Sequence, residues 1–430
     1  MTHYLYMPMV AMTTVDSYFN RESVLNQAKK VKRKRSHGID GISAKEALKI
    51  AEKEYSSIKT EVLNGTYQPD YILKVNIPKG NGKVRTIGNA NTRDRIVQGC
   101  IHNYLYDVLD GEMSNDNFGF RNNHNCQMAV LRVVDIIQEG YEWIISIDLM
   151  DCFTNLNKHL ILWLLHNVNV DNRIINSINN IISNKYINGD IIEPVKGCPQ
   201  GSNTSPDLCN MVLNQLDKML EERGHPFVRY ADDIYVFCRS QKAAQRVLKS
   251  VKRFLEKKLK LIVNEEKTQL FHCKEKVWSC LGFLIKQDVD IHIYMNPKKE
   301  EKLRMNIKGL MHNAMPNEMI QRINSLTCGW ICCNYIADMG RATKRMDAYI
   351  KRSIRGYERR HDVKVDTTKL KSCHGYYKRM LQQVQSKEKE SESVGNTNQK
   401  QSNNQPRNFD EHDTEVSLSV RAPPKSDSHK

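Results

Sequence analysis

Hydrophobic and polar positions follow two different periods along this chain of 430 residues. In long stretches apolar residues recur every three or four positions, which is the period of a helix with one buried face. We therefore expect helices over residues 18–65, 92–110, 125–139, 157–184, 205–223, 241–259 and 297–356. Shorter runs rich in β-branched and aromatic residues, bounded by Gly, Pro and Asn, predict strands. These runs lie at 71–90 and 186–196 as hairpins, at 143–149, on both sides of residues 231–232, near 261–263 and at 280–285.

The order of these elements predicts an α+β fold in which helices flank an antiparallel sheet. From residue 386 to residue 430 aromatic residues nearly vanish and Gln, Asn, Ser, Lys and Glu dominate, so we expect a disordered tail there. The 12 cysteines are spread singly through apolar segments, unlike those of a disulfide scaffold. Reduced thiols and a cytoplasmic location follow as predictions.

The chain carries a formal net charge of +16. Such a charge favours a polyanionic partner, and a nucleic acid before a membrane. A generally basic, solvated surface is the alternative, although the basic residues cluster, as in the run Lys29–Arg35. No apolar run approaches the roughly 18 residues of a membrane span, so we expect no membrane partner.

Two adjacent acids, Asp232 and Asp233, stand between two apolar runs, at the predicted tip of a β-hairpin. Neighbouring carboxylates repel each other, and a divalent cation with oxygen ligands is a common reason to keep them together. The alternative for this pair alone is a solvated turn. A third acid, Asp148, follows the apolar strand 144–147, where a simple strand cap is the alternative. Three carboxylates on neighbouring strands can hold two Mg²⁺ ions roughly 3.5–4 Å apart, as nucleotidyl transfer requires.

Five blocks, taken in their order along the chain, resemble those of reverse transcriptases: Ile145–Phe153, Gly197–Pro206, Tyr230–Asp233, Asn264–Thr268 and Leu281–Phe283. Order and spacing together carry the resemblance, because each block alone would be weak. Within the family the chain is most similar to bacterial group II intron-encoded reverse transcriptase/maturases that lack the endonuclease domain. Further similar segments lie at Gly38–Gly41, Ile77–Arg85, Phe118–Arg121 and Gly329–Tyr335.

The resemblance implies a right-hand polymerase architecture with an antiparallel-sheet palm, β-hairpin fingers and a three-helix thumb. The implied domains are an N-terminal extension with fingers at 1–140, a palm at 141–290 with finger elements returning near 157–196, a helical thumb at 291–360, a short or degenerate maturase-like segment at 361–385, and the tail at 386–430.

The resemblance also implies roles in catalysis. Asp148, Asp232 and Asp233 would bind two Mg²⁺ ions, and Lys267 would protonate the departing pyrophosphate. For Lys267 the alternative is a strand cap.

Further roles concern substrates. The residues implied to bind the incoming nucleotide are Lys79 and Arg85 at the triphosphate, Phe153 as the ring that rejects a ribose, and Gln200 and Gly201 in the pocket. The implied primer grip consists of Leu281, Gly282 and Phe283. The alternatives are solvated charges for the two basic residues, plain core for Phe153, and a buried bulge for the primer-grip segment.

The leading functional hypothesis is an RNA-directed DNA polymerase that copies an RNA template from a DNA primer with deoxynucleoside triphosphates. The same protein would bind group II intron RNA and target DNA to assist splicing and mobility. One alternative is a domesticated, group II-like reverse transcriptase in host defence or repair. Another is a non-catalytic RNA-binding splicing factor, against which the intact trio of acids argues.

Overall fold

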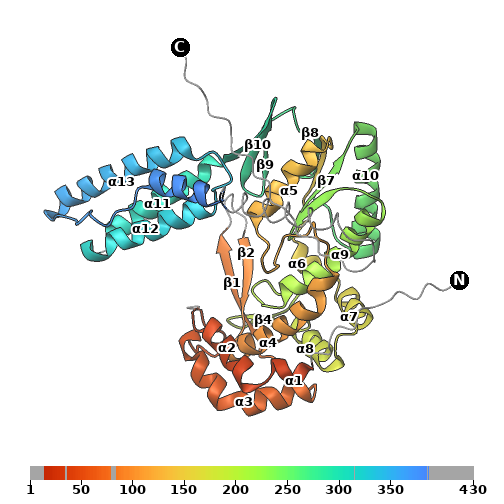
Figure 1. Ribbon diagram of the computed structural model, residues 1–430. Coiled ribbons are helices and arrows are strands. Elements are labelled where there is room, and N and C mark those ends of the chain that lie inside the picture. Colours follow the sequence, from red (N-terminus) through yellow and green to blue (C-terminus); the bar gives the residue numbers. More distant parts are fainter. Residues whose placement is uncertain (1–13, 34–35, 79–83, 314, 385, 387–430) are drawn as a thin grey trace, which may run out of the picture. The chain divides into compact units, whose positions relative to one another are not determined.

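The computed structural model describes residues 14–33, 36–78, 84–313, 315–384 and 386. The chain forms two compact units, Met1–Phe271 and His272–Lys430, each of which is described below by itself (Figure 1). Apart from residue 386, the predicted tail lies outside the described residues, and so does Lys79. Within the described ranges, no helix combines the length and the apolar character that a bilayer crossing needs.

The N-terminal part of the first unit is helical. Its elements are α1 Val15–Tyr18, α2 Arg21–Val31, η1 Ala44–Glu46, α3 Ala47–Leu63, α4 Thr92–Leu109, η2 Asp110–Glu112 and α5 Cys126–Gln138. Helix α2 begins at a side-chain cap, because Asn20 accepts a hydrogen bond from the backbone N–H of Ser23. Helices α2, α3 and α4 pack on one another, and Ala28, Ile58 and Ile101 are fully buried there.

Two hairpins join into a four-stranded sheet in the order β2-β1-β4-β5. Its strands are β1 Ile72–Pro78, β2 Val84–Asn89, β4 Lys185–Asn188 and β5 Ile191–Pro194. The predicted hairpins at 71–90 and 186–196 are confirmed, since both pairs are antiparallel. A short parallel pairing of Ile72 with Tyr186 connects them, which the local patterns did not indicate.

A second four-stranded sheet has the order β6-β7-β3-β8. Its strands are β3 Trp143–Ile147, β6 Phe227–Tyr230, β7 Asp233–Cys238 and β8 Gln269–His272. The last five residues of β7 are all buried. Because successive side chains point to opposite faces, both faces of this strand are covered. Helix α10 Gln241–Phe254 contacts β3 and β7, and α5 contacts β6.

The remaining helices of this unit are α6 Cys152–Asn155, α7 Lys158–Asn167, α8 Asn172–Ile182, α9 Ser205–Glu222 and the π-helical turn η3 Leu255–Leu259. Residues 157–184 are helical as predicted, but they form two helices, α7 and α8, separated by a turn at Asn169, whose φ is 55°. The strand predicted near 261–263 is wrong. There Val263 forms only an isolated bridge to Leu149, and the strand beside β3 is β8 instead. Residues Leu261 and Val263 are buried by packing, which imitates a strand pattern.

The second unit begins with a three-stranded sheet in the order β11-β10-β9. Its strands are β9 Trp278–Cys280, β10 Phe283–Gln287 and β11 Ile291–Met295. The single strand predicted at 280–285 is wrong, because a turn at Leu281 and Gly282 divides it between β9 and β10, and β11 was not predicted. Three helices follow: α11 Pro297–Asn313, α12 Pro316–Cys332 and α13 Gly340–His361. Helix α11 lies against both α12 and α13 (Figure 1). Helical structure thus predominates in 297–356, as predicted, with breaks between the three helices.

A further helix over residues 373–384 packs within the second unit. Its first turn is held by Asp347 of α13, whose Oδ1 accepts a 2.7 Å hydrogen bond from the backbone N–H of Cys373. The buried Tyr377 hydroxyl donates to the carbonyl of Ala337 over 2.9 Å. The sequence did not indicate this docking, because it depends on contacts between distant residues.

Candidate active site

The strand register brings two of the three predicted acids to one end of the β3–β7 pair. Strand β3 is antiparallel to β7, and Ile147 pairs with Ile234. One step further along the ladder, Asp148 comes opposite Asp233. Directly opposed residues have Cβ atoms about 4.5–5.5 Å apart, so both carboxylates share this end of the sheet.

The third acid, Asp232, lies in the two-residue turn between β6 and β7. Tyr230 pairs with Asp233 across this turn, and Ala231 has a φ of 58°. A positive φ at this position of a tight hairpin usually calls for glycine, so the turn is strained at Ala231. The hairpin therefore presents Asp232 and Asp233 consecutively beside Asp148.

A buried arginine contacts the backbone of this turn. The side chain of Arg229 has no exposed surface and forms an ion pair with the equally buried Asp217 of α9 at 2.6 Å. Its Nη1 also donates to the carbonyl of Ala231 over 3.1 Å and to Asn210 Oδ1 over 2.8 Å. These bonds join the strained turn to helix α9.

Segment 264–268 holds Asp148 from the other side. Asn264 Nδ2 donates to Asp148 Oδ2 over 2.9 Å, and Lys267 Nζ lies 3.4 Å from the same oxygen. The backbone N–H of Asp148 donates to Thr268 Oγ1 over 3.3 Å. The predicted catalytic lysine therefore lies beside a predicted metal ligand. Sequence analysis gave Asn264 no role, although it belongs to the block that contains Lys267.

The electrostatics of the three acids are mutually unfavourable. Desolvation raises the pKa of Asp233 to about 6, with further upward contributions from the charges of Asp232 and Asp148, while Lys267 opposes them. The pKa shift shows that the three carboxylates share one electrostatic environment. An excess of negative charge without enough basic neighbours is an environment that favours a cation.

The donor set fits Mg²⁺ in the manner that this ion usually binds. Among the described residues, no group of three His, Cys, Asp or Glu side chains converges closely enough to hold a metal ion alone. Magnesium normally takes one or two carboxylates, several waters and the phosphates of a substrate, rather than a closed protein cage. Asp148, Asp232 and Asp233 present carboxylate oxygens at one end of the sheet, and these residues would hold such an ion.

Three of the predicted substrate-binding residues meet where the hairpin β1–β2 approaches the loop before α9. Arg85 Nε donates to Gln200 Oε1 over 2.9 Å. The backbone N–H of Gly88 donates to the carbonyl of Gln200 over 2.7 Å. At Gly201 φ is 112°, and a Cβ would lie 2.5 Å from the carbonyl oxygen of Gly88, so only glycine fits.

Phe153, the predicted sugar-selecting ring, lies near the start of the short helix α6 and is partly exposed. Its carbonyl accepts a 2.8 Å hydrogen bond from the backbone N–H of Cys198, which precedes Gln200 in the same loop. Its ring contacts the ring of Phe120, with centroids 6.3 Å apart. Sequence analysis did not single out Phe120, and only its place in the segment Phe118–Arg121 marked the region.

The predicted primer-grip residues belong to the second unit. Leu281 and Gly282 form the two-residue turn between β9 and β10, with φ values of 47° and 79°. Positive φ at both central positions is the geometry of a tight β-hairpin. Phe283 begins β10, is 1% exposed, and has Lys299 Nζ 4.0 Å from its ring centroid. The structure thus places these residues in a hairpin turn of this unit.

The antiparallel sheet β6-β7-β3-β8, with three acids at one end, has the arrangement that the sequence resemblance implies for a polymerase palm. Residues 77–285 match the family described as reverse transcriptase (RNA-dependent DNA polymerase). These residues include all five of the sequence blocks, so the resemblance found in those blocks is confirmed.

Two curated relatives show the same similarity. The chain is 28% identical over 286 residues to "Putative COX1/OXI3 intron 1 protein" of Saccharomyces cerevisiae, covering 54% of this chain and 34% of the relative. It is 23% identical over 292 residues to "Group II intron-encoded protein LtrA" of Lactococcus lactis subsp. cremoris, covering 53% and 49%. The chain thus spans less than half the length of either relative.

A similar solved structure is that of telomerase from Candida albicans in complex with a fragment of telomeric RNA. The sequence identity is 11% and the TM-score is 0.43, with 74% of this chain and 66% of that chain covered. This TM-score is too low to support any argument about this protein.

Proposed function

We propose that the protein is an RNA-directed DNA polymerase of the group II intron type, which extends a DNA primer on an RNA template with deoxynucleoside triphosphates. The observation that carries the proposal is the register of β3 and β7, which sets Asp148 opposite Asp233 beside Asp232. The reverse transcriptase match over residues 77–285 and the relative named as a group II intron-encoded protein support it.

In this proposal Asp148, Asp232 and Asp233 hold two Mg²⁺ ions. When bound, the ions lower the pKa of the primer 3′-hydroxyl and stabilise charge on the departing pyrophosphate. The protein's own task is to hold the carboxylates at the end of the sheet. Lys267 supplies a proton to the pyrophosphate oxygen as it leaves, and the 3.4 Å distance from its Nζ to Asp148 Oδ2 supports this role.

The proposal also assigns residues to the binding of the incoming nucleotide and of the primer. Arg85, together with Lys79, binds the triphosphate, and Gln200 and Gly201 line the nucleotide pocket. The Arg85–Gln200 hydrogen bond supports a shared pocket for these two residues. Phe153 excludes the ribose 2′-hydroxyl by its bulk, and Leu281, Gly282 and Phe283 hold the primer strand.

The proposal extends to organisation and partners. The domains are those inferred from the sequence: fingers at 1–140, palm at 141–290, thumb at 291–360 and a short maturase-like segment at 361–385. The basic chain binds group II intron RNA and target DNA and assists splicing and mobility in the cytoplasm. Its net charge of +16 and the names of its intron-encoded relatives support this part.

Primer extension tests the proposal. The purified protein with Mg²⁺, deoxynucleotides and a primed RNA template should extend the primer, and Asp232→Asn should abolish extension while leaving RNA affinity nearly unchanged. Asp288→Asn, at an exposed acid paired with Lys286 in the second unit, is the matched control and should retain activity. Extension by Asp232→Asn at the wild-type rate would rule out the assigned site. Tight RNA binding by wild type without extension would instead favour a non-catalytic splicing factor.

A further inference from the structure

Phe120 holds a backbone conformation that a bulky residue rarely adopts. Its φ is 60°, in the left-handed region that favours glycine, yet the residue is 45% exposed. An aromatic residue in this region is strained, and such strain persists only where the surrounding structure imposes it. An exposed ring adds little burial to compensate for the strain.

The residue before Phe120, Gly119, lies against the turn between β6 and β7 that carries Asp232. The carbonyl of Gly119 accepts a 2.8 Å hydrogen bond from Asn210 Nδ2, and its N–H donates to Asn117 Oδ1 over 3.1 Å. A Cβ at Gly119 would lie 2.1 Å from the backbone nitrogen of Ala231. The loop therefore touches the turn that carries Asp232, and this close approach requires glycine.

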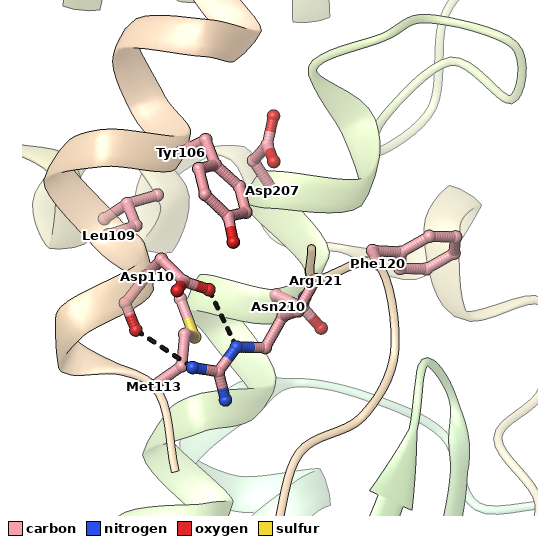
Figure 2. A pocket seen from close by; sticks show the side chains of 8 residues that line it. All are labelled: Tyr106, Leu109, Asp110, Met113, Phe120, Arg121, Asp207 and Asn210. Carbon is pink, nitrogen blue, oxygen red and sulfur yellow. Dashed lines mark hydrogen bonds and ion pairs between the residues drawn. The ribbon is translucent and has the colours of Figure 1, made fainter. Parts of the chain in front are cut away.

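The residue after Phe120, Arg121, is held by hydrogen bonds to Asp110 and Ser114. The side chain of Arg121 is only 8% exposed, and its guanidinium donates to Asp110 Oδ1 and to the carbonyl of Ser114, each over 2.7 Å. Figure 2 shows the guanidinium turned toward Asp110 and the ring of Phe120 turned away from it. Phe120 and Arg121 both line a small pocket beside Asp110.

The constrained loop directs Phe120 onto Phe153. The two rings meet edge to face, with centroids 6.3 Å apart and planes inclined at 76°. This is a favourable arrangement for an aromatic pair. The backbone of Phe153 is held by Cys198, but that hydrogen bond does not set the direction of the ring. The ring of Phe153 also packs against the hydrophobic core, and Phe120 adds an edge-to-face contact to it.

We propose that Phe120 is a specificity-determining residue for the sugar of the incoming nucleotide, because its ring holds the Phe153 ring where it rejects a ribose 2′-hydroxyl. The inference rests on the proposed function, in which Phe153 selects deoxynucleotides. Phe120 acts through Phe153 and is a positioning residue. In this proposal the strained backbone conformation of Phe120 serves the selection of deoxynucleotides and does not stabilise the fold.

The test compares Phe120→Asn with Phe120→Tyr in two measurements on the full chain. One is the ratio of single-nucleotide incorporation efficiencies for deoxyribonucleotide and ribonucleotide, and the other is the melting temperature. Asparagine accepts a positive φ and removes the ring, so the melting temperature should stay the same or rise. The ratio should fall roughly two- to tenfold, the range expected for loss of one aromatic pair. Tyrosine keeps the ring and should keep the ratio.

Two controls keep the outcomes separate. Phe153→Ala should relax sugar selection by itself, and Trp163→Ala, at an exposed aromatic residue of α7, should leave the ratio unchanged. An unchanged ratio in Phe120→Asn while Phe153→Ala relaxes selection would overturn this inference and leave the proposed function standing. A lower melting temperature with an unchanged ratio would assign Phe120 a purely structural role. Wild-type protein without any primer extension would overturn the proposed function itself.

Discussion

The guanidinium of Arg229 joins the carboxylate of Asp217 to the backbone carbonyl of Ala231, and neither charged side chain has any exposed surface. One partner lies on β6, immediately before the turn that carries two candidate metal ligands, and the other lies on α9. The strained turn is therefore attached to the core by a buried ion pair, which connects the stability of the fold to the geometry of the site.

Breaking this pair should destabilise the protein strongly. Asp217→Asn leaves the Arg229 charge buried without its counter-ion, which typically lowers the free energy of unfolding by about 3–5 kcal/mol. Urea denaturation followed by circular dichroism measures the change. Glu318→Gln, at the exposed pair with Arg322, is the control and should change stability by less than about 0.5 kcal/mol. Equal effects of the two substitutions would mean that the buried pair does not stabilise the turn.

Lys267 should affect the chemical step rather than nucleotide binding. If it protonates pyrophosphate, Lys267→Ala should slow single-turnover incorporation by on the order of 10²-fold or more, with little change in nucleotide affinity. Rapid-quench kinetics separate the two quantities. Lys252→Ala removes a lysine paired with Glu265 in the neighbouring segment and should leave the rate near that of wild type. A defect confined to affinity would assign Lys267 to binding.

Gly201 should tolerate no side chain. In Gly201→Ala the added Cβ would clash with the carbonyl oxygen of Gly88 at a φ that alanine avoids, so the loop must move away from the hairpin β1–β2. We expect a higher KM for deoxynucleotides and lower stability. Gly309→Ala, in the interior of α11 with open space around it, should instead stabilise the protein by roughly 0.5–1 kcal/mol. Melting curves should show lower stability for Gly201→Ala and higher stability for Gly309→Ala. Steady-state kinetics give the KM of each variant.

Stability should fall as pH rises above the ordinary pKa of histidine. A 2.7 Å hydrogen bond from His102 Nδ1 to Asp207 raises the pKa of His102 above its usual value of 6.5. The folded state therefore holds this proton more tightly than the unfolded state does. The stabilisation is fully present below pH 6.5 and is lost as pH rises through the folded-state pKa. Burial raises the pKa of Asp207 as well, so this carboxyl also makes stability fall as pH rises, beginning at its ordinary pKa of 3.8 and therefore at lower pH than the histidine effect.

His102→Gln isolates the histidine part of this dependence. In this variant the free energy of unfolding, measured by urea denaturation, should decrease less between pH 6 and pH 8 than it does in the wild type. An NMR titration of the His102 ring should show a midpoint above 6.5 in the wild type. A midpoint below that value would contradict the ion pair with Asp207.

The sequence by itself determined most of the elements of this protein and singled out the residues of its candidate site. Asp148, Asp232 and Asp233 could be singled out because each adjoins an apolar strand, and strand patterns are local. The hairpins at 71–90 and 186–196 and the helix that begins at Ser205 are likewise encoded by neighbouring residues. The order and spacing of the blocks were enough to identify the reverse transcriptase family.

Only the tertiary structure decided which of these residues meet. The pairing of Ile147 with Ile234, the bond from Arg85 to Gln200 and the burial of Arg229 on Asp217 each join segments that the sequence presents separately. The apolar residues at 261–263 show the same limit, since burial by packing imitates a strand. Phe120 is the clearest case. Its left-handed φ is imposed by Gly119 and Arg121 through contacts with distant elements, and no local pattern of hydrophobic and polar positions contains that constraint.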